Sequence, residues 1–143
     1  MAAPLKTVDI VINKCYGGFG LSEEAIALYN SLTGKTLSAG GEPERDDPHF
    51  VQVVRQLGSK KASGLYSKLV IRTVVDDYYS ISEYDGLEDV YFRSRPTCDV
   101  RSVIFDSSLT NDQKVDRIRE SYLELDRALE LWKSLDKDTF VNE

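Results

Sequence analysis

Apolar residues occur in short runs along the chain, and polar segments that contain glycine separate these runs. Five of these runs are rich in β-branched or aromatic residues, or alternate apolar with polar positions, and both patterns are typical of strands. The predicted strands cover 7–15, 68–75, 78–84, 88–92 and 100–105. Asp76-Asp77 predicts a turn between the second and third strands, and Asp85-Gly86 ends the third.

Two short helices are predicted between the first and second strands. The first covers 22–32, where a serine can cap the amino end and Gly34 follows the carboxyl end. The second opens at Asp47-Pro48, a cap followed by proline at the first helical position, and runs to Leu57. The segments KTLSAGGEPER and SKKASG are polar and rich in small residues, so they are predicted to be loops.

A third helix, predicted from Asn111 to Lys137, is the clearest element in the chain. Thr110 with Gln113 matches a capping box at its start. Apolar residues then recur at alternating spacings of three and four, a heptad-like seam typical of helices that pack lengthwise. The seam contains Val115, Ile118, Tyr122, Leu125, Leu129 and Trp132.

This seam is longer than a small sheet covers, since strands typically have about five or six residues. The helix is therefore expected to pack on its own core and also on another subunit or a protein partner. The residues predicted to form that interface are Ile118, Tyr122, Leu125, Leu129 and Trp132. The alternative is burial of the whole seam against the sheet of its own chain.

Together these elements predict an α+β fold, or a small open α/β fold, with a small sheet, two short helices and a long C-terminal helix. We expect residues 1–105 to form the core domain and residues 106–143 to form the long helix. A chain of 143 residues is large enough for one hydrophobic core without metals or disulfides.

The charge balance excludes several partner classes. The chain has 24 acidic and 18 basic residues and a formal net charge of −6. Nucleic-acid backbones and anionic membrane surfaces both require clustered cations, so neither partner is predicted. No apolar run approaches the roughly 20 residues of a transmembrane helix, and the opening MAAPLKTVD does not resemble a signal peptide. Only Cys15 and Cys98 are present, and a reducing, intracellular compartment is expected.

The segment NKCYGGFGLSEEA joins the first strand to the first helix, a place where glycine loops often bind phosphates. Its glycines lack the spacing of a dinucleotide-binding or P-loop motif, and the two glutamates in the first helical turn would oppose a phosphate. We therefore predict that Gly17, Gly18 and Gly20 mainly permit a tight turn and close packing of helix on strand. Tyr16 and Phe19 either belong to the core or line a pocket for a flat ligand.

No catalytic or metal-binding constellation is evident in the sequence. His49 is the only histidine, and Cys15 ends a strand, where cysteine commonly behaves as a small apolar residue. A nucleophilic pair or a zinc site would need partners that the pattern does not supply. The acidic tract from Asp76 to Asp89 offers oxygen ligands for Mg²⁺ or Ca²⁺, but turn chemistry and solubility explain it. No metal or cofactor is predicted.

Arginines form the remaining candidate chemistry. Arg93, Arg95 and Arg101 are concentrated in YFRSRPTCDVR, and Arg45 lies in ERDDP. Guanidinium groups bind phosphates and carboxylates, so these side chains either hold an anionic ligand or pair with the neighbouring acidic tract. The candidate ligand site assembled from these motifs contains Tyr16, Gly17, Gly18, Phe19, Arg45 and Arg95.

The blocks INKCYGGFGLSEEA, RDDP, ASG and EYDGLE occur in an order that resembles a family of small bacteriophage and large-DNA-virus proteins. The resemblance spans about residues 8–97 and is carried chiefly by KCYGGFGLS and EYDG. Family members often end soon after an H-R-T-W-like tail, of which this chain keeps only Arg95. The resemblance implies a viral accessory protein of the host-cell cytoplasm or the virion, and it carries over no catalytic residue. The resemblance also implies a set of polar positions that recur among members of the family. In this chain they are Lys14, Arg45, Asp47, Glu83, Asp85 and Arg95.

Two functional hypotheses follow. The first is a virus- or phage-encoded, non-enzymatic binding or assembly protein that uses its C-terminal helix as an oligomer or partner interface. The second is a binding protein for an anionic, nucleotide-like small molecule that acts on host signalling or metabolism, with the ligand at the candidate site above. A metal-assisted hydrolase built on the acidic tract ranks last.

Overall fold

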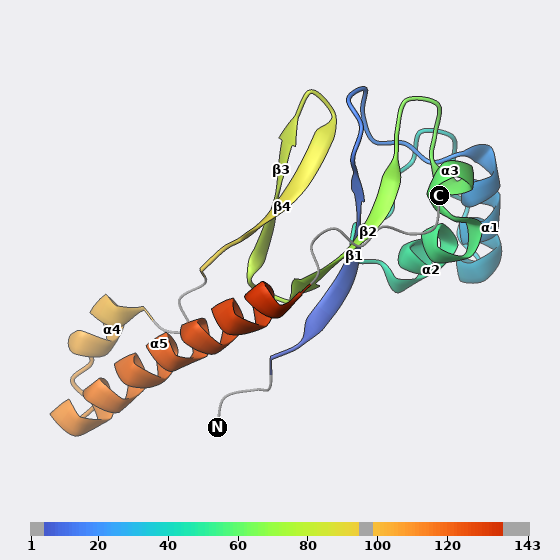
Figure 1. Ribbon diagram of the computed structural model, residues 1–143. Coiled ribbons are helices and arrows are strands. Elements are labelled where there is room, and N and C mark those ends of the chain that lie inside the picture. The colour runs from blue at the N-terminus through green and yellow to red at the C-terminus, as the bar shows by residue number, and fades with distance from the viewer. Residues whose placement is uncertain (1–4, 95–98, 136–143) are drawn as a thin grey trace.

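The computed structural model describes residues 5–94 and 99–135. Within them the fold is α+β, as predicted, and the long helix is near the carboxyl end (Figure 1). The strands are β1 (Thr7–Asn13), β2 (Leu69–Val75), β3 (Tyr79–Tyr84) and β4 (Leu87–Phe92). The helices are α1 (Glu23–Thr33), α2 (Pro48–Leu57), α3 (Ser59–Ala62), α4 (Val100–Ile104) and α5 (Asn111–Ser134).

The strands form two separate antiparallel pairs instead of one small sheet. β1 pairs with β2 from Thr7↔Val75 to Asn13↔Leu69, and β3 pairs with β4 from Tyr79↔Phe92 to Tyr84↔Leu87. The turn at Asp76-Asp77 exists, with Asp77 at φ 70°, but it does not join paired strands. The physical reason is that the apolar residues of β3 and β4 pack against a face of the β1–β2 pair, so the chain leaves the plane of that pair at the turn.

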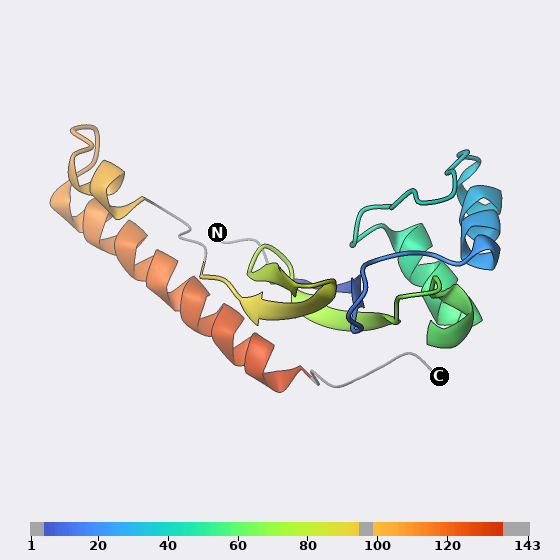
Figure 2. The same cartoon turned by 90° about the horizontal axis from the view of Figure 1, so that it is seen from above.

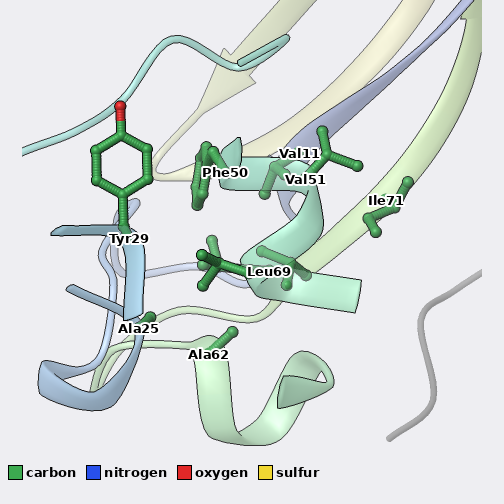
Figure 3. Packing of buried hydrophobic residues seen from close by; sticks show 10 residues of the cluster. Val11, Ala25, Tyr29, Phe50, Val51, Ala62, Leu69 and Ile71 are labelled. Carbon is green, nitrogen blue, oxygen red and sulfur yellow. The ribbon is translucent and has the colours of Figure 1, made fainter. Parts of the chain in front are cut away.

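One core lies between the β1–β2 pair and the first three helices. Val11, Leu69 and Ile71 point from one face of the strands toward α1, α2 and α3, and Phe50 fills the centre (Figure 3). Every member of this cluster is at most 6% exposed. β2 is buried along nearly its whole length, which agrees with its almost unbroken apolar sequence.

A second core lies on the opposite face of the same strands. Ile10, Ile12, Val70 and Val74 contact the β3–β4 hairpin and the carboxyl-terminal part of α5. Aromatic rings complete this layer, since Phe92 stacks on Tyr78 at 5.9 Å and meets Trp132 edge-on at 5.7 Å. Figures 1 and 2 show the result: α1–α3 lie on one side of the β1–β2 strands, and α5 lies on the other.

Local signals placed most helix ends correctly. The Ser22 side chain accepts a hydrogen bond from the Ala25 N–H, and Gly34 closes α1 in the left-handed region at φ 71°. The predicted capping box of α5 forms in both directions, from the Thr110 N–H to Gln113 at 2.8 Å and from the Gln113 N–H to Thr110 at 3.1 Å. The described part of α5 ends at Ser134, earlier than the predicted Lys137.

Two local predictions were wrong. The segment predicted as a strand at 100–105 is instead the helix α4, because Asp99 caps it by accepting a hydrogen bond from the Arg101 N–H and Val103 is buried. The polar segment SKKASG is not wholly a loop, since its first four residues form α3 after Gly58. Both helices are about one turn long, too short for a periodic pattern to reveal.

No helix among residues 5–94 and 99–135 is long and apolar enough to cross a membrane. The longest, α5, has 24 residues, but charged side chains occur along its whole length.

A hydrogen bond between Tyr29 and Asp47 connects α1 to the start of α2. The Tyr29 hydroxyl donates to Asp47 Oδ2 at 2.6 Å, and Asp47 Oδ1 accepts the His49 N–H at 2.9 Å. Hydrogen bonding to Asp47, together with burial, raises the pKa of Tyr29 to about 12. Burial raises the pKa of Asp47, but the hydrogen bonds from Tyr29 and from the backbone outweigh it, and the net pKa is lowered.

We expect Tyr29→Phe to lower the free energy of unfolding by about 2 kcal/mol, because it removes a hydrogen bond to a charged acceptor. The raised tyrosine pKa stabilises the fold below the ordinary value of about 10, and this contribution is lost as pH rises toward the folded value. The lowered Asp47 pKa stabilises the fold above the ordinary carboxyl pKa and is lost as pH falls through the folded value. Urea unfolding across pH therefore should show wild type and variant converging at both extremes. Tyr16→Phe, at an exposed tyrosine, should change nothing.

Candidate functional site

Three segments that are distant in sequence meet at one end of the molecule. They are the loop after β1, the loop before β2 and the turn between β3 and β4 (Figure 1). Asn13, which is fully buried, holds them together. Its side-chain amide donates to the carbonyls of Cys15 and Gly86 at 2.9 and 2.7 Å, and its Oδ1 accepts the Lys68 N–H at 2.8 Å.

The glycine loop lies directly against the β3–β4 turn. Gly17 and Gly18 adopt φ values of 126° and 111°, which favour glycine, and the Gly17 N–H donates to the Asp85 carbonyl at 3.2 Å. A Cβ at Gly86 would collide with the nitrogen of Gly18 and would lie 2.8 Å from its Cα. The glycines therefore permit a close approach of two segments. The segment that approaches Gly17 and Gly18 is the β3–β4 turn, whereas the sequence predicted close packing of the first helix on the first strand.

The hairpin turn has the conformation that the sequence Asp85-Gly86 favours. Both residues have positive φ, 52° and 88°, and they form a two-residue connection between paired strands. This is the pattern of a type I′ turn, whose twist matches the twist of the strands. The predicted end of the strand at this dipeptide is confirmed.

An ion pair between the buried Glu88 and the partly buried Arg45 lies beneath these loops. Arg45 Nη2 is 3.0 Å from Glu88 Oε2, and Glu88 Oε1 accepts the Asn13 N–H at 2.8 Å. The Arg45 guanidinium lies 3.4 Å from the centre of the Phe19 ring, whose other contact is edge-on with Phe50 at 5.8 Å. The arginine backbone is also fixed, because its carbonyl accepts the Val11 N–H at 2.9 Å.

The structure brings together four of the six predicted ligand-site residues, but these residues contact other parts of the protein. Gly17 and Gly18 contact the hairpin turn, while Phe19 and Arg45 stack on each other. Tyr16 is 60% exposed at the edge of the loop. Arg95 lies outside the residues that the structure describes. The arginine and the ring that were predicted to meet a ligand are thus used within the protein.

Asn13 was missed by sequence reasoning, and Glu88 appeared there only as a member of the acidic tract. The Arg45–Glu88 pair corresponds to the alternative in which an arginine pairs with that tract. Asn13 and Glu88 are among the few polar residues of the described chain that are less than 9% exposed. The available signals were weak: Asn13 follows the apolar run IVI, and Glu88 is a charged residue at the start of a strand. Their partners lie up to 75 residues away, so no local pattern indicates the contact.

Histidine, cysteine and acidic side chains were the other candidates for metal or nucleophilic chemistry, and the structure describes most of them. No group of three histidine, cysteine or acidic side chains in that part of the chain could hold a metal ion. His49 is an exposed residue in the first turn of α2, 3.6 Å from Asp47. The Cys15 thiol donates to the Tyr16 carbonyl at 3.2 Å, and Glu88 of the acidic tract is used by the ion pair. The second cysteine of the sequence, Cys98, lies outside the residues that the structure describes.

The predicted interface residues of α5 divide into two groups. Trp132 is 5% exposed within the second core, and Leu125 packs partly against the same core. Leu129 and Ile118 are half-buried, whereas Tyr122 is 59% exposed. The carboxyl-terminal part of the seam therefore attaches α5 to its own chain, while the amino-terminal part extends with α4 away from the strands (Figures 1 and 2).

Comparison with known proteins adds no functional evidence. No protein-family model, curated protein or solved structure matches this chain. The resemblance to phage and large-DNA-virus proteins therefore stays a prediction.

Proposed function

We propose that this is a non-enzymatic binding and assembly protein, of viral or phage origin, whose contact surface is the projecting half of α5 together with α4. The observation that carries the proposal is that one apolar seam is buried at its carboxyl end and exposed at its amino end. Trp132 is 5% exposed, whereas Tyr122 and Val115, on the same seam, are 59% and 50% exposed. A second chain would cover the part that the protein's own sheet leaves uncovered.

Further apolar side chains enlarge this surface. Leu123 on α5 is 44% exposed, and at the end of α4 Ile104 and Phe105 are 48% and 76% exposed. Single exposed apolar residues are ordinary, but several on two adjoining helices supply the apolar area that an interaction site needs. α4 is held beside α5 partly by a hydrogen bond from Lys114 Nζ to the Ile104 carbonyl at 2.7 Å.

The proposed occupant is a second copy of the chain. The charged residues at the positions that flank the projecting half of the seam are Lys114, Arg119 and Asp126, which carry charges of both signs. A border of one sign would repel an identical copy, whereas a mixed border can pair with itself. Two-fold symmetric dimers are the commonest assemblies of this kind, since the same surface serves both subunits.

The test is the mass of the folded protein in solution. Wild type should be a dimer or larger closed oligomer by native mass spectrometry and light scattering. Val115→Asp with Tyr122→Asp should give a folded monomer with a cooperative thermal transition, because both side chains are exposed in the single chain and burying two new carboxylates at an interface is costly. Tyr84→Asp, at a 77% exposed aromatic residue on the hairpin, is the matched control and should keep the oligomer.

A wild-type chain that stays monomeric at every concentration would contradict self-assembly. An oligomer that survives the double substitution would show that the subunits meet elsewhere and would remove the proposed surface.

A further inference from the structure

The outer edge of the β3–β4 hairpin is a strand edge that no described strand pairs with. The two strands form a sheet of their own, separate from β1 and β2 (Figure 1). β4 is the strand next to β1, because Glu88 near its start accepts the Asn13 N–H at 2.8 Å. The opposite edge of the hairpin therefore belongs to β3.

The register of the hairpin identifies the backbone groups that point outward from β3. The Arg93 N–H donates to the Tyr78 carbonyl at 2.9 Å, so the pair just before β3 is hydrogen-bonded. Hydrogen-bonded and non-hydrogen-bonded pairs alternate along an antiparallel ladder. Ser82 therefore bonds to β4, whereas the N–H and carbonyl groups of Ile81 and Glu83 point away from it. Within residues 5–94 and 99–135, no backbone group bonds to these outward groups.

The two edges of the hairpin differ in how well they are protected. On β4 the outward Val90 N–H is satisfied, because the Asp89 side chain accepts it at 2.9 Å. On β3 no side chain of the described residues does the same for Ile81 or Glu83. Residues 82–84 are also exposed, so another strand can reach this edge. Exposed edges with unpaired backbone groups are places where proteins add a strand from a partner.

The charge of the edge selects among candidate strands. Glu83 lies opposite Glu88, whose charge is paired with Arg45. Glu83 accepts the Gly86 N–H at 2.6 Å but makes no ion pair with a residue that the structure describes. A lysine or arginine on an added strand would supply the missing cation. A second copy of β3 would not, because β3 has no basic residue and the chain has a net charge of −6.

We propose that the outer edge of β3 binds an extended, basic segment of a partner protein as an added antiparallel strand. The backbone of that segment would bond to Ile81 and Glu83, and its cationic side chain would lie opposite Glu83. An apolar side chain would lie opposite Ile81, and another would pack beside Tyr84, which is 77% exposed on the other face. This surface is separate from the proposed contact on α4 and α5, so each is tested without the other.

The probe is an acetylated and amidated peptide, Thr-Val-Lys-Thr-Val-Thr-Thr, added to the full chain. In the antiparallel arrangement its lysine lies opposite Glu83 and its second valine opposite Ile81. Amide hydrogen exchange of the protein alone should be slow at Ser82 and fast at Ile81 and Glu83, since only the Ser82 N–H is in the ladder. Exchange at Ile81 and Glu83 should become about tenfold slower when the peptide reaches about ten times its Kd.

Backbone methylation of the peptide distinguishes strand addition from other kinds of binding. N-methylation of the lysine and the second valine removes the two N–H donors that face β3, so this peptide should not bind. N-methylation of the threonines on either side of the second valine removes donors that face away, so this peptide should bind like the unmodified one. Equal binding by the two methylated peptides would exclude strand addition.

Glu83→Gln tests the charge that selects the strand. The variant keeps an acceptor for the Gly86 N–H and should weaken binding of the peptide about threefold, as expected for an exposed ion pair. Glu24→Gln, at an exposed glutamate on α1, is the matched control and should leave the affinity unchanged. A peptide with glutamine in place of lysine should bind wild type and Glu83→Gln equally.

Three further results would overturn the proposal. The first is unchanged exchange of the β3 amides at millimolar peptide. The second is slow exchange at Ile81 and Glu83 in the protein alone, which would show that another copy already pairs with this edge. The third is equal weakening by Glu83→Gln and Glu24→Gln, which would show that only the net charge of the chain matters.

Discussion

Replacement of Gly86 by alanine is expected to lower the free energy of unfolding by about 3 kcal/mol. Two effects add. At φ 88° an alanine side chain costs about 1 kcal/mol, and the new Cβ would also collide with backbone atoms that have no rotamer to change. Those atoms belong to Gly18, whose Cα would lie 2.8 Å away, and to Gly17, whose nitrogen would lie 2.9 Å away.

The matched control for this substitution is Gly40→Ala. Gly40 has nearly the same conformation, with φ 82°, but a Cβ there would meet no atom within 4 Å. We expect it to cost only the conformational part, about 1 kcal/mol. Urea unfolding of both variants measures the difference, which isolates the contact between the hairpin turn and the glycine loop. Equal losses for the two variants would mean that this contact does not stabilise the fold.

Replacement of Glu88 by glutamine is expected to cost a similar amount, about 3 kcal/mol, because it removes the charge of a buried carboxylate that pairs with the partly buried Arg45. Glutamine keeps the size of the side chain, but it leaves the Arg45 cation without its nearest counter-charge at 3.0 Å. No other group can replace the lost carboxylate well. The buried Nε of Arg45 makes no hydrogen bond, and its other acidic partner, Glu42, is 3.6 Å away.

Glu42→Gln is the control for the ion pair. This carboxylate is half-exposed, and exposed ion pairs typically contribute less than about 1 kcal/mol. Equilibrium unfolding of the two variants should therefore separate them by about 2 kcal/mol. If Glu88→Gln is as mild as Glu42→Gln, the pair does not link β4 to the segment before α2, and the cluster around Asn13 must be held by its amide hydrogen bonds alone.

The two substitutions together also define how the candidate site is built. Gly86 tests the backbone approach of the hairpin to the glycine loop, and Glu88 tests the side-chain link beneath it. The Gly86 contact joins the hairpin to the loop after β1, and the Glu88 contact joins it to the segment before α2, so the loss of either should loosen the same hairpin. Amide hydrogen exchange should then show faster opening of β3 and β4 in both variants.

Local chemistry determined the parts of this fold that depend on neighbours in sequence. The caps at Ser22 and Thr110 satisfy backbone N–H groups within a few residues, and the proline at the start of α2 and the Asp85-Gly86 turn set the backbone angles of their own segments. Such contacts act in the same way wherever the segment lies in the fold. The α+β class followed for the same reason, since it needs only the identity of the elements.

Only the tertiary structure decided which strands pair, which charges meet and which part of α5 is covered. Tyr122 and Trp132 belong to one seam with one spacing, yet Trp132 is buried and Tyr122 is exposed, because the second core extends under only one end of the helix. Likewise Arg45 and Glu88 are 43 residues apart, and the sequence left open whether the arginine pairs with the acidic tract or holds a ligand. The energy of such contacts depends on burial and on distance in space, and neither quantity is contained in a local pattern of residues.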